Sequence, residues 1–156
     1  MLGRYYEDFT VGDTYRHPFG RTISEADNTW FTLLTLNTNQ SHFNADYAAR
    51  TPYKRLLVNS TLTVAIVTGL SVPDVSQHAF ANLGWEQINM PSPVFVGDTI
   101  YAKSTVLDLR ESKSRPYAGI VKVFTTGFNQ DGVDVITWTR TMLTYKRGHG
   151  PGFEDS

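Results

Sequence analysis

The most apolar segment of the chain reads Leu62-Thr63-Val64-Ala65-Ile66-Val67-Thr68-Gly69-Leu70. A helix that is apolar on nearly every side has to be surrounded by other elements, so this segment is expected at the centre of the fold. It follows a polar turn, Asn59-Ser60-Thr61, where the unpaired N–H groups of a helix and the positive end of its dipole would meet polar side chains. Asn59 or Ser60 can also cap the helix, and the two roles are compatible.

Beyond Pro73 the apolar spacing changes from helical to alternating, which indicates strands. The expected strands are Trp85–Met90, Thr99–Leu109, Ala118–Asn129 and Asp134–Lys146. Residues 129–132, Asn-Gln-Asp-Gly, predict a hairpin turn, because glycine takes the positive φ that such turns require. Antiparallel strands need an apolar surface to lie against, and the central helix supplies it. We therefore predict an α+β protein with the hot-dog fold, in which a curved antiparallel sheet wraps around a central buried helix.

The residues before the central helix predict two further helices. Ser24 is expected to begin the first as its N-cap, with Asp27 completing a variant of the capping box. Asp27 can also be read as a catalytic acid, but its place at a helix start favours the structural role. The helix continues with one apolar face, formed by Trp30, Phe31, Leu33 and Leu34. A shorter helix, residues 45–50, follows the cap Asn44.

Length and composition favour a single globular domain over residues 1–156, with a flexible tail at 148–156. Hydrophobic residues make up 40% of the chain and charged residues 19%, which excludes disorder as a description of the whole. A net charge of -1 gives no electrostatic case for nucleic acid or an anionic membrane as partner. There is no cysteine, no signal-like start and no apolar run long enough to span a bilayer, so we expect a cytoplasmic protein.

Polar side chains gather shortly before the central helix, in Leu36-Asn37-Thr38-Asn39-Gln40-Ser41-His42-Phe43-Asn44. On its own this segment can be a polar loop with a chance histidine. However, Ser60 follows His42 by eighteen residues and marks the helix start, so groups able to orient a substrate are delivered beside a buried element. We interpret the segment as a candidate active site.

Three segments in this order resemble the MaoC-type hydratases and dehydratases, which are hot-dog proteins acting on acyl-CoA thioesters. They are Arg21–Asp27, Asn39–Ala45 and Pro93–Thr99. The resemblance covers most of the chain, and within the family it points to the mesaconyl-CoA hydratase-like branch, partly through Arg110–Pro116. It implies an acyl-CoA substrate and no cofactor beyond the CoA of that substrate.

The family motif runs Gly-Asp-x-Asn-Pro-x-His, and this chain keeps only part of it. Asn39 and His42 match, whereas Leu36, Asn37 and Gln40 stand at the glycine, aspartate and proline positions. In the family, aspartate and histidine together hold the water that adds to a trans-2-enoyl thioester. Asn37 can orient a water but cannot take its proton, so His42 becomes the sole obvious acid/base, while Asn39 is an implied substrate contact.

The helix start supplies the other half of the implied site. Addition of water to the β-carbon places negative charge on the thioester oxygen, which an N–H at a helix start stabilises. Family members often carry His-Gly at the positions of Asn59 and Ser60; Ser60 keeps the backbone N–H, and Asn59 is an implied substrate contact. Lys113 and Arg115 can meet the CoA phosphates or can belong to a solvated hairpin loop.

Three functions therefore stay open at this point. The first is a hydratase or dehydratase with His42, Asn37 and Ser60 as catalytic residues. The second is a non-catalytic hot-dog subunit that completes an active partner, which the lost aspartate permits, and the third is an acyl-CoA thioesterase. No two histidines have metal-ligand spacing, so no metal is expected. Long strand edges that need covering predict a homodimer or higher homo-oligomer.

Overall fold

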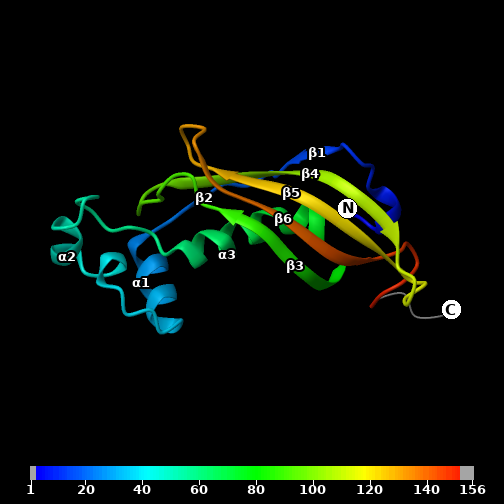
Figure 1. The fold of residues 1–156 in the computed structure, drawn as a ribbon, viewed down its shortest axis with the longest axis horizontal. Helices are drawn as coiled ribbons and strands as arrows, with labels where there is room; N and C mark the ends of the chain where they lie inside the picture. Colours follow the sequence, from blue (N-terminus) through cyan, green and yellow to red (C-terminus); the bar gives the residue numbers. More distant parts are fainter. Residues whose placement is uncertain (1–2, 152–156) are drawn as a thin grey trace.

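The computed structural model describes residues 3–151, which form one curved antiparallel sheet with a long helix against it (Figure 1). The helices are α1 (Glu25–Leu34), α2 (Ala45–Ala49) and α3 (Ser60–Ser71), with short turns η1 (Tyr6–Asp8), η2 (Gln40–His42) and η3 (Val72–Ser76). The strands are β1 (Thr14–Arg16), β2 (Arg21–Thr22), β3 (Ala79–Asn89), β4 (Thr99–Glu111), β5 (Ala118–Phe128) and β6 (Asp134–Tyr145). Their order is β1-β4-β5-β6-β3, and β2 pairs with the start of β4. The predicted α+β arrangement is confirmed.

The main core lies between α3 and the sheet. One apolar cluster joins the two layers, and its buried members include Leu62, Val67, Leu70, Ile100, Ile136 and Trp138. The layers are in close contact at Gly127 of β5, where a Cβ would lie 2.6 Å from Cγ2 of Val67. A side chain at position 127 would therefore push the helix off the sheet.

The prediction that the central helix is enclosed on all sides is wrong within the single chain. The side of α3 that faces away from the sheet is exposed at Thr61, Ala65 and Gly69, which are four residues apart and so share one face. These side chains are small, and this explains the error: a segment can be apolar all round without being covered all round.

The predicted apolar face of α1 is present, but most of it does not pack on the chain. Trp30 is 78% exposed and Leu34 is 81% exposed, whereas Asn28 and Thr32 are fully buried. The helix therefore turns polar residues inward and apolar residues outward, apart from the half-buried Phe31. Its predicted start is confirmed, because Ser24 and Asp27 form the reciprocal capping box.

Three strands lie close to where the alternation predicts them, but β3 does not. It begins at Ala79, six residues before the predicted Trp85. The segment 79–84, Ala-Phe-Ala-Asn-Leu-Gly, has no β-branched residue and gives no local strand signal. It becomes a strand through pairing with β6, where Ala79 lies opposite Thr144 and Gly84 opposite Thr141.

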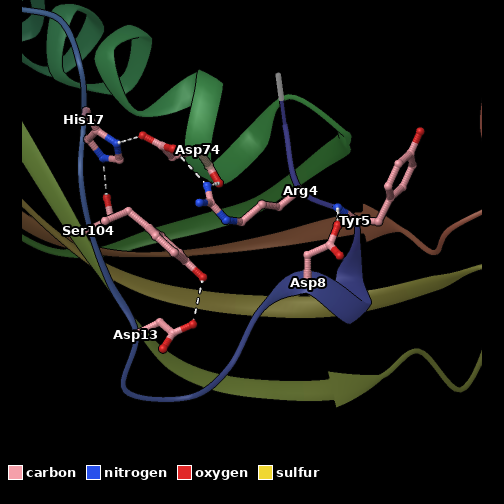
Figure 2. A network of polar contacts seen from close by, with 8 residues as sticks. Arg4, Tyr5, Asp8, Asp13, His17, Asp74 and Ser104 are labelled. Atoms are coloured by element: carbon pink, nitrogen blue, oxygen red, sulfur yellow. Dashed lines mark hydrogen bonds and ion pairs between the residues drawn. The ribbon is translucent and has the colours of Figure 1, made fainter. Parts of the chain in front are cut away.

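A buried polar cluster ties the N-terminal segment to the sheet (Figure 2). His17 Nδ1 lies 2.9 Å from Asp74 Oδ2, and its Nε2 lies 2.9 Å from Ser104 Oγ. Arg4 donates to Asp74 from the other side at 2.9 Å. Ser104, His17 and Asp74 have the connectivity of a nucleophilic triad, but Ser104 is fully buried and His17 is 4% exposed, so no substrate can reach them. The cluster is structural.

The end of the described chain forms a turn, in which the His149 N–H donates to the Lys146 carbonyl at 3.1 Å. The predicted flexible tail falls mostly on residues 152–156, which lie outside the described residues. Within the described range, no helix is long and apolar enough to cross a membrane.

Candidate active site

His42 ends the short turn η2, and its ring is held from one side only. Nδ1 lies 2.8 Å from the carbonyl oxygen of Leu57. Because a carbonyl can only accept, Nδ1 carries the proton of the neutral ring and Nε2 carries the lone pair. His42 is 7% exposed, and among the described residues Nε2 has no hydrogen-bond partner. The ring is thus oriented as a general base with its working nitrogen free.

The residues before His42 are bound to one another. Leu36 has φ 59°, and the Asn37 N–H reaches back to the Thr32 carbonyl at 3.0 Å, which closes the end of α1. Asn37 Oδ1 accepts from the Asn39 N–H at 3.0 Å. Asn39 Oδ1 in turn accepts from the Ser41 N–H at 3.1 Å. Both amides therefore shape the loop that carries His42, and the Asn37 side chain stays half-buried.

The start of α3 provides a free donor beside a pocket. Asn59 caps the helix, with Oδ1 accepting from the Thr61 N–H at 3.0 Å, so the predicted cap is confirmed. The backbone N–H of Ser60 has no partner among the described residues. Ser60 and Thr63 line a pocket of about 230 Å³, and its other walls are Tyr53, Leu57, Val58, Met90, Pro91, Ser92, Pro93, Val94 and Val135.

The structure brings some of the predicted site residues together. Leu57 lines the pocket, and its carbonyl holds the ring of His42, so one residue links His42 to the pocket that Ser60 lines, although His42 is not itself a lining residue. Lys113 and Arg115 lie in the loop between β4 and β5, at the opposite end of the sheet from α1 and α2 (Figure 1). Within one chain they do not share a site with His42.

Two residues near the pocket were not predicted from the sequence. Asn28 of α1 is fully buried and hydrogen-bonded to the main chain at three points. Arg55 stacks on Phe95, with the guanidinium carbon 3.6 Å from the ring centroid, and Phe95 contacts the pocket residue Tyr53. Among the described residues Arg55 has no carboxylate partner. In the sequence, an arginine after a predicted helix, such as Arg55, is only a weak indication of a binding site. An asparagine inside a predicted helix, such as Asn28, gives no indication of one.

Comparison with known proteins fits this geometry. The family model described as mesaconyl-CoA hydratase matches residues 2–150. The chain belongs to the mesaconyl-CoA hydratase family. It is 34% identical to the mesaconyl-CoA hydratase of Cereibacter sphaeroides, over 93% of this chain and 42% of that protein. It is 29% identical to the (R)-specific enoyl-CoA hydratase of Rhodospirillum rubrum, over 95% of this chain and 96% of that protein.

A solved structure confirms the fold. A conserved hypothetical protein of Mycobacterium tuberculosis, which has a double hotdog fold, superposes with a TM-score of 0.83 at 21% identity, over 99% of this chain and 47% of that one. The predicted hot-dog fold is therefore confirmed, and the chain corresponds to one of the two units. It likewise spans less than half the length of the mesaconyl-CoA hydratase that it matches.

Among residues 3–151, no three histidine, aspartate or glutamate side chains are placed to hold a metal ion.

Proposed function

We propose that the chain adds water to, or removes it from, the 2,3 double bond of an enoyl-CoA thioester, with branched and dicarboxylic acyl groups of the mesaconyl type as the first substrates to test. The observation that carries this proposal is the position of Leu57. It lines the pocket together with Ser60, and its carbonyl orients His42, so one residue connects the proposed base to the cavity that carries the proposed oxyanion donor. The names of the two relatives described above support the same reaction class.

In the hydration direction, His42 Nε2 takes a proton from water while the water oxygen bonds to C3 of the acyl group. The electron pair of the double bond moves to the thioester oxygen, where the Ser60 N–H stabilises the charge by about 3 kcal/mol, by analogy with single oxyanion-hole donors. The enolate then returns the pair to C2, which takes the proton from the imidazolium. His42 ends neutral, and one water has been added.

For the phosphates of CoA we propose Arg55. Its stacking on Phe95 leaves the edges of the guanidinium free to donate, and arginine matches phosphate oxygens with two parallel hydrogen bonds. Arg55 is close to the pocket through Phe95 and Tyr53, whereas Lys113 and Arg115 lie at the far end of the sheet.

We also propose that the working form is a dimer of this chain. The outer edge of β3 pairs with no other described strand, and Leu83 and Ile88 of this strand are 51% and 44% exposed. Pairing two such edges would hide both, and a second copy would also cover the small exposed face of α3.

A specific observation favours a second candidate, a non-catalytic hot-dog unit. Asn37 stands at the position of the family aspartate, and its Oδ1 is engaged with the Asn39 N–H. Such a unit would hold the fold and the pocket while a partner supplies the chemistry.

The test is the loss of enoyl-thioester absorbance with crotonyl-CoA and mesaconyl-CoA, for the wild type, His42→Ala and Asn37→Asp. We expect turnover by the wild type and none by His42→Ala. An inactive wild type together with an active Asn37→Asp variant would show that the site has lost its activity through the asparagine at position 37. If all three proteins are silent, the non-catalytic unit is supported, and release of free thiol without hydration would instead show a thioesterase.

A further inference from the structure

Asn28 uses its whole side-chain amide on the main chain around the candidate site. Its Nδ2 donates to the carbonyl oxygen of His42 at 2.8 Å and to that of Leu57 at 3.0 Å. Its Oδ1 accepts from the N–H of Asn59 at 2.9 Å. We propose that Asn28 is a positioning residue, which fixes the imidazole of His42 and the first N–H of α3 in one geometry.

The Asn28 amide connects the segment that holds His42 with the start of α3. The Leu57 carbonyl that accepts from Asn28 is the same oxygen that holds His42 Nδ1 at 2.8 Å. On the other side, Asn59 precedes Ser60, whose free N–H is the oxyanion donor. Loss of the Asn28 amide would therefore remove the contact shared by the segments that carry the base and the donor.

No regular element could take over this task. His42 ends a turn of three residues, and residues 50–59 between α2 and α3 contain no helix and no named strand. Asn28, by contrast, is in the first turn of the ten-residue helix α1, next to its capping box. Asparagine is suited to the position, because one short side chain has to donate twice and accept once. Aspartate cannot donate when ionised, and an apolar residue can do neither.

The kinetic consequence rests on the proposed function. Because Asn28 is fully buried, it touches no substrate, and its loss should lower kcat with little change in KM. Misplacement of a reacting group by about 1 Å can cost about 100-fold in rate, so we expect a fall of about 10- to 100-fold for Asn28→Ala and for Asn28→Asp.

Thr32→Val is the matched control. Thr32 is one turn further along α1 and equally buried, and its Oγ1 accepts from the Asn59 side chain at 3.2 Å without contacting His42 or Leu57. If Asn28 only supported the fold, both substitutions would lower the melting temperature and kcat together. We expect both to lower the melting temperature and only the Asn28 variants to lower kcat at temperatures where all are folded. Equal kcat values for the Asn28 and Thr32 variants would overturn the proposal.

A second measurement does not depend on activity. The ¹⁵N chemical shifts of the His42 ring report which nitrogen is protonated, with His42→Gln used to assign the signals. We expect a protonated Nδ1 in the wild type and in Thr32→Val, and a mixture of tautomers in the Asn28 variants. An inactive wild type with this tautomer change would refute the proposed function and keep the positioning role. An active wild type whose tautomer is unchanged by Asn28→Ala would refute the positioning role. Should Asn28→Ala fail to fold, the equally sized Asn28→Asp carries both readouts.

Discussion

At position 36 the backbone takes a left-handed conformation that L-residues rarely adopt. Leu36 has φ 59° and is 88% exposed, so it carries the strain without gaining burial in return. The cost for a residue with a Cβ is about 1–2 kcal/mol, and glycine avoids it. The family motif has glycine there, which fits the geometry of the turn.

Replacing Leu36 by glycine should therefore stabilise the protein. We expect Leu36→Gly to raise the free energy of unfolding by about 0.5–1 kcal/mol, because the relief of strain exceeds the entropy that glycine loses on folding. Urea unfolding followed by circular dichroism measures the change. Leu34→Gly is the control, since Leu34 is similarly exposed but helical, and it should destabilise by about 1 kcal/mol. If both substitutions stabilise the protein, or if neither does, the backbone at Leu36 is not strained.

Arg55 gives a second prediction at a single residue. If it binds the CoA phosphates, Arg55→Gln should raise KM for an acyl-CoA about 10-fold, since a charge-assisted bond contributes about 1.5–3 kcal/mol. The same variant should leave KM unchanged for the N-acetylcysteamine thioester of the same acyl group, which has no phosphate. Lys113→Gln, at the far end of the sheet, is the matched control. Equal effects on both thioesters would show that Arg55 only supports Phe95.

Among the elements, β4, β5 and β6 were the most predictable, because alternation of apolar residues and a turn at the end mark each of them in the sequence. β4, β5 and β6 begin at the predicted residues Thr99, Ala118 and Asp134. The early part of β3 and the orientation of α1 could not be predicted, because both depend on partners distant in the sequence. The same holds for the site: His42 and Ser60 are visible as a pattern, whereas Asn28 is recognisable only once residues 42, 57 and 59 surround it.

The contact between β5 and α3 predicts a steric effect at Gly127. A Cβ there would lie 2.6 Å from Val67 Cγ2 and 2.8 Å from Ile136 Cγ2, so Gly127→Ala should destabilise by about 1–3 kcal/mol. Gly84→Ala is the control, because nothing lies within 4 Å of a Cβ at that position. It should change stability by less than about 0.5 kcal/mol. Thermal unfolding of the two variants compares them, and equal melting temperatures would contradict the close packing.

The buried cluster between η3 and the sheet should make stability depend on pH. Burial lowers the pKa of His17, against the opposing effect of Asp74. Burial alone would raise the pKa of Asp74, but hydrogen bonds from His17 and Arg4 outweigh it and lower that pKa. Both groups then bind protons more readily in the unfolded chain than in the folded one. The free energy of unfolding therefore decreases as the pH is lowered, first below the ordinary histidine pKa of 6.5 and again below the ordinary aspartate pKa of 3.8.

The histidine step can be isolated by substitution. His17→Gln breaks the cluster and should lower the free energy of unfolding at pH 7 by about 1–3 kcal/mol. Its stability should no longer decline just below pH 6.5. His149→Gln, an exposed histidine near the C-terminus, should keep that decline. Denaturant unfolding at a series of pH values gives both slopes. Parallel curves for the wild type and His17→Gln would show that His17 does not carry the step.

For the molecule as a whole, the exposed surfaces predict how it assembles. A single chain leaves the edge of β3 unpaired and leaves one face of α3 and most of the apolar face of α1 exposed, and these are the surfaces that an interface would cover. The opposite edge is formed by β1 and β2, which have only three and two residues, and such short edge strands offer little for another chain to pair with. The proposed dimer would therefore form through the β3 side.

Ile88→Lys tests this assembly, because a lysine on an edge strand opposes pairing and in a two-fold interface the substitution acts twice. We expect the wild type to sediment at twice the mass of one chain and Ile88→Lys to shift toward the monomer by at least about 10-fold in dissociation constant. Leu107→Lys is the matched control: Leu107 is also 44% exposed, but it belongs to β4, an inner strand. A wild type that sediments as a monomer would contradict the dimer outright. Equal shifts in both variants would show that added charge, and not the β3 edge, governs assembly.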